Sequence, residues 1–321
     1  ILYDMFNRRE DTWCERVYSP WPDLDAEMRE HDIPLFALES QDPIKDFDFL
    51  GITLQYEMCY TNILQVLDLA GIQLRTRDRK KGDTLVIGGG PCSYNPEPIA
   101  DFFDIFYMGE GEVSYDALLE LYKVYKHSDM TREEFLIKVS NIPGLYVPEL
   151  YEVTYKEDGT IASFAPRFED VPATITKTVV MDHSKVTYPE KPVVSFMKLT
   201  QDRVVLEIMR GCIRGCRFCQ AGMIYRPTRP KDVNLLKGYA EKMLASTGHE
   251  EITFSSLSSS DYEELPELTD CLIEKMDNEH VNISLPSLRI DAFSLDVMSK
   301  IQDVKKSCLL YTSPSPRDLS T

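Results

Sequence analysis

The chain has 321 residues, of which 43% are hydrophobic and 27% charged, and its formal net charge is -18. This length and composition predict a globular protein of about two domains and exclude a mainly disordered chain. The acidic balance argues against a broad surface for nucleic acid or anionic membranes. No apolar run approaches the ~20 residues that a membrane span needs, and no secretory signal is visible. We therefore expect a cytoplasmic protein without a membrane partner.

Both ends of the chain differ from those of an ordinary domain. The first residues, ILYDMFNRRE, have the pattern of an amphipathic helix and begin with Ile1, so we expect that the natural protein starts earlier. Near the other end, Cys308 to Asp318 read CLLYTSPSPRD, which looks like the translation of a transposon-end sequencing adapter. We treat residues 308–321 as not biological and exclude them from fold reasoning.

The first part of the chain alternates between short apolar runs and helical patterns. Apolar runs at 48–55, 84–90 and 103–112 predict strands, and the spacing of apolar residues at 60–72 and 114–126 predicts helices. Alternation of this kind favours a parallel sheet with helices on both faces, whose ligands bind beyond the carboxyl ends of the strands. Residues 1–126 are therefore expected to form an α/β domain.

The pattern changes in residues 127–199, which we interpret as a connector with a β-hairpin turning at Asp158 and Gly159. A second alternation begins near residue 200. Its predicted strands and helices, in chain order, are 203–209, helix 233–246, strand 251–256, helix 261–276, strand 281–288 and helix 295–302. The sequence thus predicts a second α/β region over residues 200–307.

Eight cysteines without a secretory signal indicate reduced thiols and metal ligands rather than disulfides. Four stand alone in the sequence and are expected to be small buried hydrophobic residues: Cys14, Cys59, Cys92 and Cys271. Three others lie within eight residues directly after a predicted strand: Cys212, Cys216 and Cys219. Three thiolates at this spacing can each bind one iron of a 4Fe-4S cluster and leave the fourth iron open to a substrate. The alternative is a zinc site that a distant fourth ligand completes.

The segment CIRGCRFC resembles the signature of radical S-adenosylmethionine (SAM) enzymes, including the aromatic Phe218 before the third cysteine. The resemblance implies that the three cysteines bind a 4Fe-4S cluster, whose open iron chelates SAM, and that Phe218 packs near the adenine. It also implies an electron donor such as flavodoxin or ferredoxin. Five nearby arginines could offset the charge of the cluster or could form a solvated loop: Arg210, Arg214, Arg217, Arg226 and Arg229.

Other SAM contacts follow from the same resemblance. Many of these enzymes have a GGE-like element after the second strand, where this chain has SSLSSSD, so Ser256 is a candidate SAM contact. Ser260 with Glu263 could instead form a helix capping box. Arg289, with Ser287 nearby, is a candidate SAM contact after the third strand. The family's partial (β/α) barrel needs about six strand-helix units, whereas this chain contains three, so we expect a truncated barrel that is inactive alone.

In the first domain, GGGPCSYNPEP and the GEGE element resemble the end of a cobalamin-binding domain of the flavodoxin-like, doubly wound type. By this resemblance the cofactor-binding candidates are Gly88, Gly89, Gly90 and Thr53, although the glycines could also serve only a turn that needs positive φ. Cys92 stands where the family often has histidine, and the family's Asp-x-His-x-x-Gly motif is absent. No motif surrounds any histidine, so each is expected to be a surface or capping residue: His31, His127, His183, His249 and His280.

The main functional hypothesis is therefore a radical SAM enzyme that generates a substrate radical, with cobalamin as a potential methyl carrier. A second hypothesis is a methylthiotransferase that modifies tRNA or a ribosomal protein, in which Cys14, Cys59 and Cys92 would bind a second cluster. A third is a non-catalytic module that binds a metal and a nucleotide. The substrate does not follow from the sequence.

Overall fold

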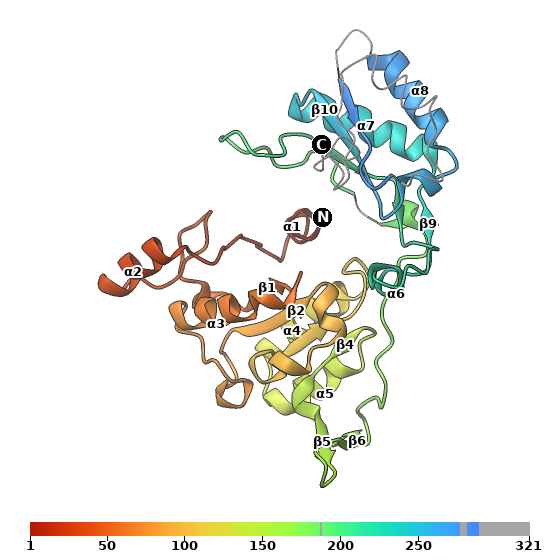
Figure 1. The fold of residues 1–321 in the computed structure, drawn as a ribbon. Helices are drawn as coiled ribbons and strands as arrows, with labels where there is room; N and C mark the ends of the chain where they lie inside the picture. The colour runs from red at the N-terminus through yellow and green to blue at the C-terminus, as the bar shows by residue number, and fades with distance from the viewer. Residues whose placement is uncertain (187, 277–280, 289–321) are drawn as a thin grey trace, which may run out of the picture. The chain divides into compact units, whose positions relative to one another are not determined.

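The computed structural model describes residues 1–186, 188–276 and 281–288 (Figure 1). The chain divides into two compact units, Ile1–Val180 and Met181–Thr321. Each unit has a parallel β-sheet and its own hydrophobic core. The α/β class that the sequence predicts is thus confirmed for both parts of the chain.

A four-stranded sheet in the order β1-β2-β3-β4 forms the centre of the first unit. Its strands are β1 (Phe49–Thr53), β2 (Leu85–Gly89), β3 (Ile105–Tyr107) and β4 (Leu145–Tyr146). The first three are parallel, and β4 pairs with β3 in the antiparallel direction. The helices are α1 (Leu2–Asn7), α2 (Pro22–Glu30), α3 (Tyr60–Leu69), α4 (Tyr115–Lys126) and α5 (Arg132–Ser140).

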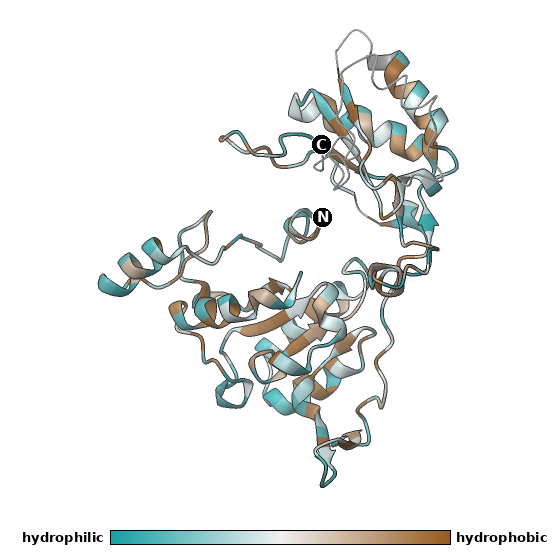
Figure 2. Ribbon diagram, viewed as in Figure 1, coloured by the Kyte–Doolittle hydropathy of each residue, from teal (hydrophilic) through white to brown (hydrophobic). Residues whose placement is uncertain are grey.

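Burial explains why these segments form strands and helices. The apolar residues of β2 are fully buried, as expected for a central strand of a parallel sheet, and Figure 2 shows apolar residues concentrated on the strands of this unit. Helix α3 buries Ile63, Leu67 and Leu69, whereas Asn62 and Asp68 are exposed. Helix α5 begins with a capping box between Thr131 and Glu134. The three strands and two helices predicted for residues 48–126 are therefore confirmed, with shorter bounds.

The structure divides the predicted connector, residues 127–199, between the two units. Its first part supplies α5 and β4, and so belongs to the first sheet and its core. The predicted hairpin follows as β5 (Tyr151–Tyr155) and β6 (Ile161–Pro166), with Gly159 at a φ of 81° in the turn. Sequence periodicity does not identify β4, because a two-residue strand is too short to show a pattern.

The second unit contains a three-stranded parallel sheet in the order β11-β10-β7. Its strands are β7 (Val204–Glu207), β10 (Glu251–Ser255) and β11 (Asn282–Ser284), and its helices are α7 (Val233–Thr247) and α8 (Leu265–Met276). Two shorter strands, β8 (Met209–Arg210) and β9 (Arg229–Pro230), pair separately in the antiparallel direction and flank the short helix α6 (Ala221–Ile224). The predicted strand-helix order is confirmed up to β11, and the predicted helix at 295–302 lies outside the described residues.

The ends of the two long helices follow from local chemistry. Helix α7 begins after Asp232, whose carboxylate accepts hydrogen bonds from the amides of Asn234 and Leu235, and it ends at Gly248 in the left-handed conformation. Helix α8 begins at Leu265 rather than at residue 261. Ser260 is therefore not the N-cap of α8, and the capping box expected between Ser260 and Glu263 is wrong: these residues precede the helix, and Ser259–Asp261 form a 3-10 turn.

Candidate functional site

The three clustered cysteines lie in the loop that leaves β8 and enters α6. The loop starts at Gly211, which has a φ of 83°. A Cβ atom at this position would come within 2.4 Å of the carbonyl oxygen of Pro227, at the return of the chain into β9. Glycine is thus required both by the backbone angle and by the close approach of the two chain segments.

The thiols differ in their surroundings. Cys212 is half-buried, and the amide of Arg214 donates a hydrogen bond to its Sγ at 3.4 Å, whereas Cys216 and Cys219 are exposed. The exposed fraction of Phe218 is 93%. In the described part of the chain no three His, Cys, Asp or Glu side chains are close enough together to hold a metal ion. The assignment of the three cysteines as ligands therefore stays a prediction from their spacing.

The loop nevertheless suits an iron-sulfur cluster chemically. It offers three thiols: Cys216 and Cys219 are exposed, and a backbone N–H is directed at the sulfur of Cys212. The donor set thus fits a cluster bound at three corners.

A group of charged residues braces the start of the loop. Glu207, at the carboxyl end of β7, accepts a hydrogen bond from Arg210 Nε at 2.9 Å and another from Lys231 Nζ at 2.8 Å. The Lys231 side chain is almost fully buried, and its Nζ lies 4.0 Å from the centre of the Tyr188 ring. Burial acts to raise the pKa of Glu207, but Arg210 and Lys231 outweigh it and hold the pKa below its usual value. Glu207 is thus a paired carboxylate, which the sequence analysis did not identify.

Three of the five arginines near the cysteine loop form hydrogen bonds or ion pairs with other residues of the second unit. Arg210 and Arg214 are paired with Glu207 and Asp261, and Arg214 makes two contacts with its carboxylate, at 2.6 and 3.2 Å. Arg229 is buried and donates to the carbonyl oxygens of Pro227 and Tyr225. The alternative of a purely solvated loop is therefore wrong for these three. The other two, Arg217 and Arg226, lie at exposed positions.

Hydroxyl groups gather where the chain leaves β10 and β11. The hydroxyls of Ser256 and Ser259 lie 3.0 Å apart, and Ser259 Oγ donates to the carbonyl oxygen of Pro286 at 2.7 Å. Ser287 has a φ of 61° and accepts a hydrogen bond from the amide of Ser259. The candidate Ser256 thus belongs to a hydrogen-bonded corner between two strand ends. The candidate Arg289 lies outside the described residues.

The glycine candidates of the first unit have different local roles. A Cβ at Gly88 would meet Leu54, Phe103 and Phe106 at 2.9 to 3.0 Å, so the protein's own core takes up that space. Gly90 has a φ of 109° and packs on the Leu54 backbone, which agrees with the turn alternative. A Cβ at Gly89 would have no contact below 3.9 Å.

Thr53 and Gly89 are paired in register at the carboxyl ends of β1 and β2, and Thr53 is exposed. The two residues together form an open ledge of small side chains. Of the three glycines, Gly89 is the one at which an added Cβ would have no close contact.

The isolated cysteines and histidines agree only partly with expectation. Cys92 is buried, and burial raises the pKa of its thiol, whereas Cys14, Cys59 and Cys271 are half-buried. Among the described histidines His183 is the exception, because it is 6% exposed and neither ring nitrogen has a hydrogen-bond partner among the described residues. His280 lies outside the described residues. Burial, followed by the nearby Arg210 and Lys231, lowers its pKa. The expectation of a surface or capping role is therefore wrong for His183, and no sequence motif marks it.

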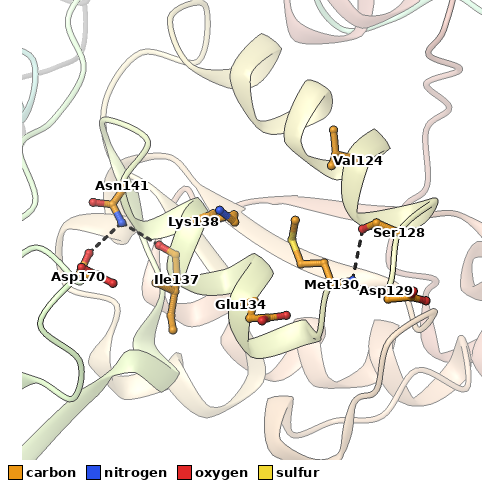
Figure 3. Close-up of a pocket in the computed structure, with 9 residues that line it drawn as sticks. All are labelled: Val124, Ser128, Asp129, Met130, Glu134, Ile137, Lys138, Asn141 and Asp170. Atoms are coloured by element: carbon orange, nitrogen blue, oxygen red, sulfur yellow. Dashed lines mark hydrogen bonds between the residues drawn. The ribbon is translucent and has the colours of Figure 1, made fainter.

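A pocket of about 840 Å³ lies elsewhere, where α4 ends and α5 begins (Figure 3). Its lining includes Ser128, Met130 and Asn141. The amide of Met130 donates a hydrogen bond to Ser128 Oγ in the loop between the helices, and Asn141 Nδ2 donates to the carbonyl oxygen of Asp170. None of the predicted site residues lines this pocket. A smaller pocket of about 270 Å³ is lined mainly by aromatic and apolar side chains around Tyr146 and Tyr151.

Comparison with known proteins identifies the family. The family model of radical SAM proteins, N-terminal, matches residues 1–148, and the model of the radical SAM superfamily matches residues 206–311, which include the three-cysteine loop. The chain belongs to the radical SAM superfamily. None of the described helices of this radical SAM protein is both long and apolar enough to cross a membrane.

A curated relative and two solved structures are similar to this radical SAM chain. The chain is 30% identical over 276 residues to the uncharacterised protein MJ0966 of Methanocaldococcus jannaschii. The match covers 85% of the chain and 51% of the relative. The chain thus spans about half the length of that relative.

The solved structures are more distant. The radical SAM methyltransferase TsrM from Kitasatospora setae, with cobalamin and a 4Fe-4S cluster bound, is 13% identical with a TM-score of 0.45, covering 87% of this chain and 49% of its own. The cobalamin-dependent SAM radical enzyme OxsB, with aqua-cobalamin and SAM bound, is 15% identical with a TM-score of 0.45. The match covers 75% of this chain and 30% of the OxsB chain. At these TM-scores the likeness supports no inference about individual residues.

Proposed function

We propose that the protein is an enzyme of the radical SAM class that cleaves SAM reductively and forms a radical on its substrate. The observation that supports this most directly is the CIRGCRFC loop, which follows β8 inside the segment that matches the superfamily model. Its three thiols, the positively charged side chains around it and its position after the first strand of a parallel sheet suit a site open to a substrate.

The protein's own residues would bind and orient the reactants. Cys212, Cys216 and Cys219 would hold a 4Fe-4S cluster, which when bound supplies the electron that cleaves a carbon-sulfur bond of SAM. The pairing of Glu207 with Arg210 and Lys231 fixes the direction in which the loop leaves the sheet. Phe218, exposed on the loop, is available to pack on a nucleobase, and Ser256 offers a hydroxyl at the end of β10.

A finer proposal concerns the first unit. We propose that its sheet corresponds to a flavodoxin-like cobalamin-binding domain and that the second sheet is the first part of a partial barrel. Thr53 and Gly89 form the open ledge over which a corrinoid would lie, and cobalamin would then serve as a methyl carrier. An electron donor such as flavodoxin or ferredoxin completes the system.

Anaerobic reconstitution with iron and sulfide tests the proposed function. The full-length protein that contains this chain should bind about four irons and four sulfides per chain, absorb in the visible range, and release 5'-deoxyadenosine from SAM after reduction. Single substitutions of Cys212, Cys216 or Cys219 by alanine should remove the cluster. The matched control is Cys271→Ala, a half-buried thiol on α8 whose loss should leave iron binding unchanged.

Several outcomes would contradict the proposal. Binding of one zinc ion instead of the cluster, or intact SAM after reduction of the loaded full-length protein, would favour a non-catalytic module. A second cluster that depends on Cys14, Cys59 and Cys92 would favour the methylthiotransferase hypothesis. Titration with hydroxocobalamin, followed by the visible spectrum, tests the first unit separately.

A further inference from the structure

The second sheet has one apolar face and one polar face. On β7 and β10 the buried Val204, Leu206, Ile252 and Phe254 belong to the core that α7 and α8 share. Because side chains alternate along a strand, the residues between them point to the opposite face. That face consists of Arg203, Val205, Glu207, Glu251, Thr253, Ser255, Asn282 and Ser284. A parallel sheet covered by helices on both sides is usually apolar on both faces, so a face with this many polar residues is unusual for a parallel sheet.

The strand register places these polar residues next to one another. Glu251 pairs with Asn282, and Thr253 pairs with Ser284 on one side and with Val205 on the other. Paired residues on neighbouring parallel strands point to the same face, so Thr253 and Asn282 lie on it from adjacent strands. The sequence alone does not show this neighbourhood, because it depends on which residues of β10 and β11 are opposite each other.

Two side chains on this face have buried polar atoms without partners. Thr253 is 7% exposed and Asn282 is 9% exposed, and no described residue forms a hydrogen bond with Thr253 Oγ1 or Asn282 Oδ1. Leaving a buried polar atom unpaired costs free energy, and folded proteins rarely tolerate it without a reason. The charged residues of the same face are paired: Arg203 Nη1 with Glu251 at 2.7 Å, and Glu207 with Arg210 and Lys231.

We propose that Thr253 and Asn282 bind the substrate and that this substrate presents a neutral group with N–H or O–H donors, such as an amide, a nucleobase or a sugar hydroxyl. This proposal rests on the proposed function and adds the chemical class of the substrate. Asn282 Oδ1 can only accept a hydrogen bond, so the ligand must donate to it, while the Thr253 hydroxyl can donate or accept.

Other classes of ligand fit less well. A carboxylate or phosphate has no donor for Asn282 Oδ1, which would stay unpaired. A hydrocarbon would leave both polar atoms unpaired, and a site built to hydrogen-bond its ligand rejects an analogue that lacks the polar group.

The stability of the free chain gives the first test. Thr253→Val and Asn282→Leu keep the side-chain shape and remove the unpaired groups, so each should raise the temperature of thermal unfolding of the second unit. The matched control is Thr269→Val, since Thr269 is also buried but its hydroxyl donates to the Leu265 carbonyl at 2.8 Å. This control should lower the unfolding temperature. If Thr253→Val and Asn282→Leu lower it as well, the two groups have a structural role and the proposal is wrong.

Ligand binding gives the second test, with propionamide as the probe and N,N-dimethylpropionamide as its matched analogue without N–H donors. We expect propionamide, titrated into the full chain, to shift the NMR amide signals of β10 and β11. The dimethyl analogue should shift them much less, and Asn282→Leu should abolish the response. Equal shifts from both amides, shifts that persist in Asn282→Leu, or no shifts at all would overturn the proposal. Since neither test uses iron or SAM, their failure is distinct from a failure of the proposed function.

Discussion

Gly211 determines how the chain leaves β8 and enters the cysteine loop. Its φ of 83° lies in the region that residues with a Cβ rarely adopt, and the Pro227 carbonyl oxygen occupies the place where a Cβ would be. The amide of Arg214 then donates to Cys212, so the first thiol is oriented by the backbone on both sides. At this scale the site depends on the backbone path of a few residues more than on any one ionisable group.

Gly211→Ala should therefore disturb the loop. Strain of this kind costs about 1–3 kcal/mol, and the loss should appear as a lower free energy of unfolding of the second unit and as less iron bound after reconstitution. Gly215→Ala is the control, because Gly215 lies in the same loop with nothing within 4 Å of an added Cβ. An equal loss of iron in both variants would show that the loop tolerates no added methyl group anywhere, and that Gly211 has no special role.

At the scale of secondary-structure elements, buried ion pairs join segments that are distant in the sequence. Asp104, directly before β3, accepts hydrogen bonds from Arg79 and from the amide of Val86, both at 2.7 Å, and also pairs with Arg132 of α5. The side chains of Asp104 and Arg79 are 0% and 1% exposed. Since Arg79 also donates to the backbone carbonyls of Gln73, Leu74 and Phe102, one buried carboxylate holds the loops beside β2 and β3 in place.

Asp104→Ala should strongly destabilise the first unit. It leaves the buried Arg79 charge without its carboxylate, which typically costs about 3–5 kcal/mol. Asp101→Ala is the matched control: its carboxylate pairs with Arg75 at the surface, where such pairs contribute about 1 kcal/mol or less. Chemical denaturation followed by circular dichroism measures both. A loss below 1 kcal/mol for Asp104→Ala would mean that water enters and solvates Arg79.

At the scale of the whole molecule, the chain has two hydrophobic cores, each built from residues of one unit. The largest fully buried side chains of the first core include Phe103, Phe106 and Phe135. In the second core, Phe254 is one of the largest fully buried side chains. We therefore expect each core to stabilise its own unit, because burial of apolar surface is the main favourable term in folding.

Phe254→Ala should lower the stability of the second unit by about 3–5 kcal/mol and leave the first unit protected. Hydrogen exchange measured by mass spectrometry should show faster exchange in β7, β10 and β11 only. Phe164→Ala, on the exposed hairpin, serves as a control that should change little. Faster exchange in β1 to β3 of the Phe254→Ala variant would show that the two units unfold together.

Much of this architecture could be predicted from the sequence, because it depends on local patterns. Apolar runs identify β1, β2, β7 and β10, helical spacing identifies α3, α4 and α7, and turn residues identify the hairpin at Gly159. The three-cysteine loop is also a local feature, since its spacing and its place after a strand are visible in the printed residues. The start of α8 was predicted too early, because the residues before Leu265 form a 3-10 turn.

The sequence by itself determined the strand-helix order, the thiol spacing and the family, since these depend on residues a few positions apart. Only the tertiary structure decided which distant residues meet: Lys231 with Glu207, Arg79 with Asp104, and Glu251 beside Asn282 on the polar face of the second sheet. It also showed that His183 is buried with no hydrogen bond to any described residue. The physical reason is that burial and pairing depend on strand register and packing, which bring together residues that no sequence interval relates.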